Sequence, residues 1–178
     1  TDADVVIEGG LVVEVGPGLD GDMGVDCSGK AVLPGLFDCH VHLSTRYEDF
    51  DEYARMQEPF SLPFFRMGEN LRTTIALGIT TVRDASGDLP HHVLAWRREI
   101  INGTLFGPTL LSSGPKIEGI APVWKGTLET GSEADIDRAL ETLAKLDVDF
   151  VKITDSTLKP ELFLYAVRKA RAAGLKAS

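Results

Sequence analysis

From Leu36 to its last residue, the chain alternates strand-like segments with helix-like segments. The strand-like segments are short and rich in apolar and β-branched residues, whereas three of the four helix-like segments end shortly before a glycine, at Gly78, Gly103 and Gly174. Strands are expected at 36–42, 79–84, 109–112, 150–154 and 175–178, and helices at 64–77, 90–101, 134–146 and 160–173. This alternation is typical of a parallel α/β fold, because parallel strands need crossover connections.

The residues before this region are β-rich and contain no helix-like pattern. Val5–Ile7 and Leu11–Val13 flank the pair Gly9–Gly10, which is a signal for a two-residue hairpin turn. A further short strand is expected at 31–33. An isolated hairpin is only marginally stable in water, so we expect these strands to need partners from elsewhere.

The number of strand–helix units also limits the fold. Four and a half such units are too few for an eight-stranded barrel, which takes about 250 residues. An open sheet of this size would expose an edge that proteins usually cover or close. We therefore expect the sequence to be the amino-terminal portion of a larger chain, lacking a short stretch before Thr1 and a long one after Ser178.

The first strand of the alternating region ends with two histidines. Side chains alternate along a strand, so His40 and His42 share one face, with Asp38 one step deeper on the same face. The opposite face, expected to be buried against helices, holds Phe37, Cys39 and Val41. Two neutral imidazoles side by side suit a divalent metal. A lone His-x-His triplet is often incidental, so its context decides between the two interpretations.

Charge and composition exclude some partners. The net charge of −9 argues against nucleic acid or an anionic membrane surface as the main partner, since both attract basic patches. No apolar run is long enough to span a bilayer, and no signal peptide is visible at the amino terminus. The two cysteines, Cys27 and Cys39, are expected to be reduced and packed, which favours a cytoplasmic protein.

Three segments resemble motifs of the amidohydrolase superfamily, whose members are metal-dependent hydrolases built on a distorted (β/α)8 barrel. The segments are Val25–Lys30, Leu33–His42 and Gly78–Asp84. In that superfamily the first barrel strand ends in His-x-His, which matches His40 and His42. The resemblance implies that residues 1–33 form part of a β-sandwich domain. It also implies that residues 34–178 form the first half of the barrel, with strands one to four and the start of strand five.

Within the superfamily, the segments Gly78–Asp84 and Asp149–Ile153 most resemble the imidazolonepropionase and prolidase-like group, which includes Xaa-Pro and Xaa-Arg dipeptidase-like enzymes. Many members carry a fourth-strand lysine that reacts with CO2 to form a carbamate bridging two metals, and Lys152 matches that position. A buried, unpaired ammonium is costly, and carboxylation removes this cost. In the alternative interpretation, Lys152 reaches solvent or pairs with an acid.

The resemblance implies an enzyme that cleaves a C–N bond, amide or peptide, as in a dipeptide or an N-acyl amino acid. Its cofactor would be a divalent metal, expected as two Zn²⁺ ions held by His40, His42 and carboxylated Lys152, with a metal-bound hydroxide as nucleophile. The general-base aspartate and two further histidines are expected beyond Ser178. The expected partners are a small amide or dipeptide substrate and the remaining barrel half of the same polypeptide, and we leave homo-oligomerisation open.

Active sites of such barrels lie at the carboxyl ends of the strands, so the segments 44–47, 84–87 and 114–131 are expected to border the substrate. Asp38 could orient a metal ligand or be a buried structural acid. Asp84 could have a polar role there or form a salt bridge with an arginine. The candidates for contact with a carboxylate or an apolar group, which could equally be ordinary loop surface, are Arg46, Tyr47, Lys116 and Trp124.

Two other functions stay open at this stage. One is a cyclic-amide hydrolase or deaminase with a mononuclear site and no carbamate. The other is a metal-free barrel that serves as a binding or assembly module. Metal content separates the three hypotheses, because they require about two, one and no bound ions per chain.

Overall fold

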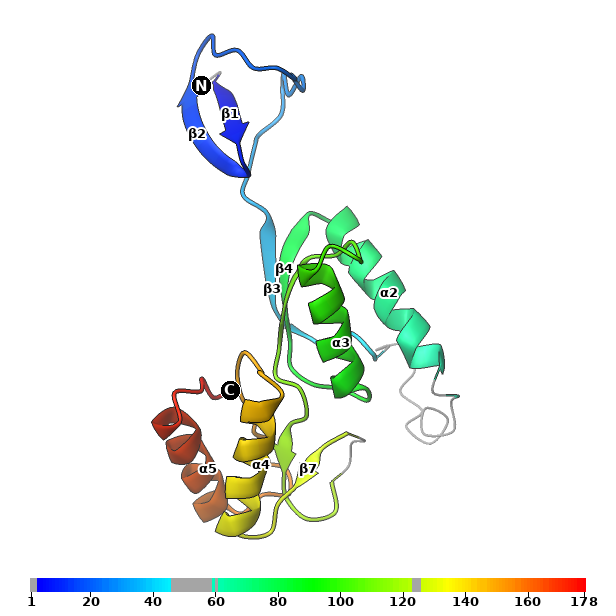
Figure 1. The fold of residues 1–178 in the computed structure, drawn as a ribbon, viewed down its shortest axis with the longest axis vertical. Coiled ribbons are helices and arrows are strands. Elements are labelled where there is room, and N and C mark those ends of the chain that lie inside the picture. Colours follow the sequence, from blue (N-terminus) through cyan, green and yellow to red (C-terminus); the bar gives the residue numbers. More distant parts are fainter. Residues whose placement is uncertain (1–2, 46–58, 60, 123–125) are drawn as a thin grey trace. The chain divides into compact units, whose positions relative to one another are not determined.

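A computed structural model describes residues 3–45, 59, 61–122 and 126–178 of the chain (Figure 1). The chain divides into two compact units, Thr1–Pro34 and Gly35–Ser178. The first unit contains β1 (Asp4–Glu8) and β2 (Leu11–Gly16), which pair antiparallel. Gly9 and Gly10 form the turn with φ of 56° and 81°, a conformation that glycine adopts without steric cost. The predicted hairpin is confirmed, whereas no strand forms at the described residues 31–33.

The second unit contains an array of parallel strands, and helices connect its first three strands to one another. Its first three strands, β3 (Leu36–Val41), β4 (Ile79–Asp84) and β5 (Thr109–Ser112), are hydrogen-bonded in that order. Both pairings are parallel. The predicted parallel α/β fold is therefore confirmed.

The chain beyond β5 extends this array. The short strand β6 (Ile117–Glu118) bridges Ile153 in parallel, and Val151 in turn bridges Ala177. The backbone N–H of Ile117 donates to the Lys152 carbonyl at 2.8 Å. The fourth and fifth predicted strands are thus present only as isolated bridges. The segment predicted as a loop, 114–131, contains both β6 and a second short strand, β7 (Leu128–Glu129).

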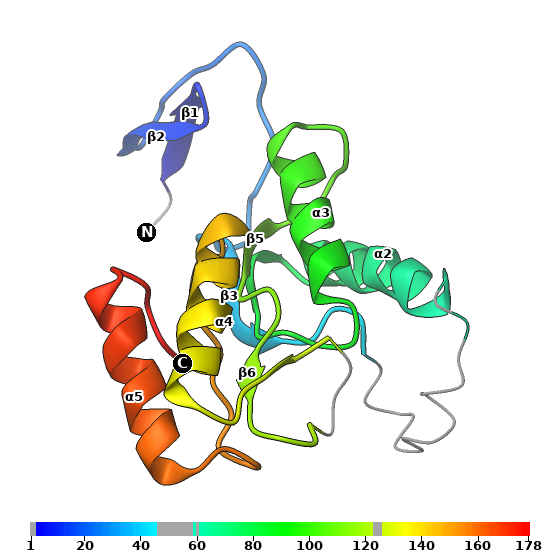
Figure 2. The ribbon, with the colours of Figure 1, turned by 60° about the horizontal axis from the view of Figure 1, so that its bottom comes forward.

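Within the ranges that the structure describes, four helices lie between or after the strands, close to the predicted bounds (Figure 2). They are α2 (Ser61–Ala76), α3 (Pro90–Ile101), α4 (Glu133–Lys145) and α5 (Pro160–Ala172). The Ser132 hydroxyl accepts the Asp135 N–H at 3.2 Å and so caps the amino terminus of α4. No helix in the described ranges is long and apolar enough to cross a membrane.

The core consists of two apolar clusters that lie between strands and helices. One includes Leu43, Met67 and Val82, and the other joins residues of β6, α4 and α5 to Val151 and Ile153. Because side chains alternate along a strand, burial of Val151 and Ile153 on the helix side turns their neighbour Lys152 to the opposite face. This alternation places the predicted metal-binding lysine outside the apolar core.

The first strand is more exposed than its sequence predicts. Of the three side chains expected to pack against helices, Val41 lies against the core cluster, whereas Phe37 is 70% exposed and Cys39 is exposed. The reason is that β3 lies at an edge of its described sheet, with β4 as its neighbour. Cys27 is exposed as well, so the expectation of two packed cysteines is wrong, although both are free thiols.

Candidate functional site

The two histidines lie together at the carboxyl end of β3. Their ring centroids are 5.1 Å apart, and the ring planes meet at 71°. Desolvation and the nearby positive charge of Lys152 lower the pKa of His40 below its usual value. This shift favours the neutral form of His40, which is the form of imidazole that binds metals.

His42 is oriented by a hydrogen bond to the main chain. Its Nδ1 lies 2.7 Å from the carbonyl oxygen of Ser86, which follows β4. Because a carbonyl oxygen only accepts, Nδ1 carries the hydrogen and Nε2 of the neutral ring keeps its lone pair. A ring that donates its other N–H to a carbonyl in this way is typical of metal-ligating histidines.

Asp84, at the end of β4, is fully buried beside this bond. Its carboxyl group accepts the backbone N–H of Leu43 at 2.9 Å and that of Ser86 at 3.1 Å. Burial raises the pKa of Asp84 to about 7, against the opposing effect of these two hydrogen bonds. Asp84 could have a polar role at the site or form a salt bridge with an arginine. Its described hydrogen-bond partners are backbone N–H groups, which favours the polar role over the salt bridge.

Lys152 is half-buried on the strand face opposite the apolar core. On the same face Phe150 packs under Arg83, whose guanidinium carbon lies 3.7 Å from the ring centroid. Nη1 of Arg83 also donates to the Cys39 carbonyl at 3.1 Å, which ties β4 to β3. The face that carries the histidines and the lysine is therefore polar and cationic.

A buried ion pair lies at β6, where the sequence suggested loop surface. Lys116 is 8% exposed, and its Nζ lies 3.3 Å from Oε2 of the fully buried Glu118. Oε1 of Glu118 accepts the Ser156 hydroxyl at 3.0 Å. Burial lowers the pKa of Lys116, and Glu118 opposes this shift. Sequence reasoning missed Glu118, because the two-residue strand that carries it has no periodicity from which it could be predicted.

The structure thus brings some predicted site residues together and leaves others undescribed. His40, His42 and Lys152 share one region, and Asp38 accepts the backbone N–H of His40 at 3.1 Å. Arg46, Tyr47 and Trp124 lie outside the described residues. Among the described residues, no group of three His, Cys, Asp or Glu side chains could hold a metal by itself. The described donors are therefore two imidazoles and a lysine.

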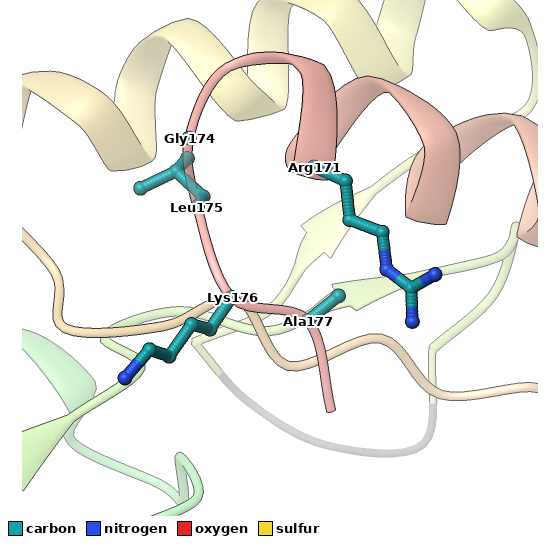
Figure 3. A pocket seen from close by; sticks show the side chains of 5 residues that line it. All are labelled: Arg171, Gly174, Leu175, Lys176 and Ala177. Atoms are coloured by element: carbon teal, nitrogen blue, oxygen red, sulfur yellow. The ribbon is translucent and has the colours of Figure 1, made fainter.

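A pocket also lies at the end of α5. It is lined by Arg171, Gly174, Leu175, Lys176 and Ala177 (Figure 3). None of the predicted site residues lines it, so it lends no support to the predicted chemistry.

Comparison with known sequences identifies local relatives. No family model matches the chain. A dihydroorotase of Trichlorobacter lovleyi is 58% identical over 43 residues, which cover 22% of this chain and 10% of that protein. An imidazolonepropionase of Chloroflexus aggregans is 40% identical over 60 residues, which cover 29% of this chain and 14% of that protein.

Comparison with solved structures covers nearly the whole chain. A prolidase in complex with N-methylphosphonate-L-proline has a TM-score of 0.79 at 21% identity, over 98% of this chain and 50% of that one. A Xaa-Pro dipeptidase with bound methionine has a TM-score of 0.71 at 19% identity, over 97% and 50%. The chain therefore spans about half the length of these two proteins. The comparisons confirm the resemblance to the amidohydrolase superfamily and the partial barrel as the fold.

Proposed function

Starting from the fold and motifs shared with amidohydrolase-superfamily enzymes, we propose that this chain carries part of the active site of a metal-dependent hydrolase. The reaction is cleavage of a C–N bond, amide or peptide, in a small substrate such as a dipeptide or an N-acyl amino acid. The observation that carries the proposal is the 2.7 Å contact between His42 Nδ1 and the Ser86 carbonyl. This contact places the ring hydrogen on Nδ1, so Nε2 is the nitrogen whose lone pair would bind a metal, beside the ring of His40.

The described donor set fits a divalent cation such as Zn²⁺. His40 and His42 would hold it through their ring nitrogens, and the edge position of β3 leaves His40 exposed to an incoming ligand. When bound, such a cation lowers the pKa of a coordinated water and polarises a substrate carbonyl. Asp38, which accepts the His40 backbone N–H, would stabilise the strand end at this point.

Lys152 is proposed to complete the site as a carbamate. Its charge already acts on His40, and its strand face is shared with Phe150 and Thr154 rather than with the apolar core. The neutral amine of Lys152 would add to the carbon of CO2 and release one proton. The product is an anion with two oxygens, which could bridge two cations.

The test is the metal content and the hydrolytic activity of the purified full-length protein. We expect about two Zn²⁺ per chain, and hydrolysis measured over dipeptides, N-acyl amino acids and cyclic amides. His40→Asn and His42→Asn are each expected to lose metal and at least about 100-fold in rate. His91→Asn, at the exposed start of α3, is the matched control and is expected to retain both.

Lys152→Ala and ¹³CO2 labelling test the carbamate. A ¹³C carbamate signal that disappears in the Lys152 variant supports the two-metal site. One metal and a free lysine would favour a mononuclear cyclic-amide hydrolase or deaminase instead. If the wild-type protein binds no divalent metal and hydrolyses none of these substrates, the proposal is wrong and a binding or assembly module is favoured.

A further inference from the structure

The ends of β3 and β4 are joined by four hydrogen bonds beyond the sheet itself. The first two connect the Ala85 N–H to the Val41 carbonyl at 2.9 Å and the Leu43 N–H to the Asp84 carboxyl group at 2.9 Å. The other two connect His42 Nδ1 to the Ser86 carbonyl at 2.7 Å and the Asp88 N–H to the Ser44 hydroxyl at 3.1 Å. We call the segments 41–44 and 84–88 with these bonds the strand-end clamp.

The side chain of Asp84 accepts hydrogen bonds from both segments of the clamp. Oδ2 accepts from Leu43, which follows His42, and Oδ1 accepts from Ser86, whose carbonyl meets the His42 ring. The carboxyl group therefore sets the distance between the backbone that carries His42 and the carbonyl that orients its ring. Its complete burial excludes water as a competing donor.

The conformation of Ser86 supports a positioning role for its backbone. Its φ is 76°, which non-glycine residues adopt rarely and keep only where their surroundings enforce it. Its hydroxyl is buried, and the described structure gives it no hydrogen-bond partner. Ser86 therefore contributes its backbone carbonyl to the site. Asp84 accepts the Ser86 N–H and so fixes the turn that orients this carbonyl toward the His42 ring.

We propose that Asp84 is a positioning residue for His42: through the turn at Ser86 it fixes the tautomer and the ring orientation in which Nε2 faces the metal. This inference rests on the proposed function for the identity of the ligand. The clamp itself is a property of the metal-free chain, so it can be measured without metal or substrate.

The first test uses Asp84→Asn, which keeps the size of the side chain but replaces one acceptor oxygen by a donor. In full-length, metal-free protein labelled with ¹⁵N-histidine, wild-type His42 is expected as the Nδ1–H tautomer, with its signal assigned by its loss in His42→Gln. In Asp84→Asn we expect a mixture of tautomers. Zn²⁺ titration of the same proteins should show affinity weakened about 10- to 100-fold in the variant.

Two further variants guard against a general effect on folding. Ser44→Ala removes another bond of the clamp and is expected to move the His42 tautomer in the same direction by a smaller amount. Asp149→Asn is the matched control, because Asp149 accepts the backbone N–H of Ser112 at 2.8 Å without contacting the clamp. It is expected to leave the His42 tautomer unchanged.

The outcomes separate this inference from the proposed function. If wild-type protein binds Zn²⁺ but neither Asp84→Asn nor Ser44→Ala alters the His42 tautomer or the affinity, the positioning role is wrong and the proposed function stands. If wild-type protein binds no Zn²⁺ but the His42 tautomer changes in the variants, Asp84 does position His42 and the proposed function is wrong.

Discussion

At the scale of single residues, the ionisation of Asp84 is expected to make the stability of the fold near the candidate site depend on pH. Burial raises its pKa to about 7 from the model-compound value of 3.8, so the folded protein binds this proton more tightly than the unfolded chain. The resulting stabilisation is complete below pH 3.8 and is lost as the pH rises through about 7. A shift of this size corresponds to on the order of 4 kcal/mol.

Asp84→Asn removes this ionisation. We expect the free energy of unfolding of the metal-free wild type, relative to that of the variant, to fall between pH 4 and pH 8. Urea titrations at several pH values measure both proteins under the same conditions. A difference that is constant over this range, or that rises with pH, would show that Asp84 does not titrate as its burial implies.

The ion pair between Lys116 and Glu118 gives a second prediction at this scale. Glu118→Gln keeps the hydrogen bond from Ser156 but leaves a cation in a buried position, so we expect a loss of about 3–5 kcal/mol in unfolding free energy. Replacing both residues, as in Lys116→Met with Glu118→Leu, should cost less than Glu118→Gln alone, because no buried charge then remains.

A double-mutant cycle of Lys116→Met, Glu118→Leu and their combination measures the coupling between the two residues by urea denaturation. An additive cycle, in which the double variant loses the sum of the two single losses, would contradict a stabilising interaction within the pair. The pair also shows a limit of sequence reasoning. Lys116 and Glu118 stand in a stretch rich in glycine and proline, and only the tertiary fold buries them.

At the scale of elements, local signals predicted most bounds. Pro90 and the pair Asn102–Gly103 delimit α3 in the sequence, and the structure has the same helix. The two-residue strands β6 and β7 were not predicted, because so short a segment has no periodicity of its own. The predicted strand 150–154 is reduced to two bridges, at Val151 and Ile153.

The site residues also divide into those that a local sequence pattern predicts and those that only tertiary contacts reveal. His40 and His42 were found because a strand places every second side chain on one face. Ser86 could not be found in this way, because it contributes a backbone carbonyl, and the residue type at a position carries little information about its carbonyl. The role of Asp84 depends equally on contacts between separate strands.

The amino-terminal cap of α4 is a prediction that belongs to this scale. The Ser132 hydroxyl accepts the Asp135 N–H, and the Asp135 carboxylate in turn accepts the Gly131 N–H at 3.0 Å. Ser132→Ala is expected to lower the unfolding free energy by about 1 kcal/mol, whereas Ser132→Asp should retain most of the stability. Equal losses in the two variants, measured by thermal and urea denaturation, would show that the cap bond contributes nothing.

At the scale of the whole molecule, strand alternation separates packing from chemistry in the unit Gly35–Ser178. Val82, Val151 and Ile153 face the helices and build the apolar clusters. Lys152 and Arg83 lie on the other face, within electrostatic reach of His40. The proposed metal ligands on different strands therefore lie outside the core, and binding of one ion would join strands that are far apart in the sequence.

This arrangement predicts that metal binding stabilises the whole fold. An ion bound only by the folded protein adds about 2.7 kcal/mol to the unfolding free energy at a free concentration of 100 times its Kd. We expect Zn²⁺ to raise the melting temperature of the metal-free, full-length protein, and the rise to diminish at low pH, where the imidazoles are protonated. In a His40→Asn, His42→Asn double variant the rise should be lost, while His91→Asn should retain it. A stabilisation by Zn²⁺ that persists in the double variant would place the ion elsewhere in the molecule.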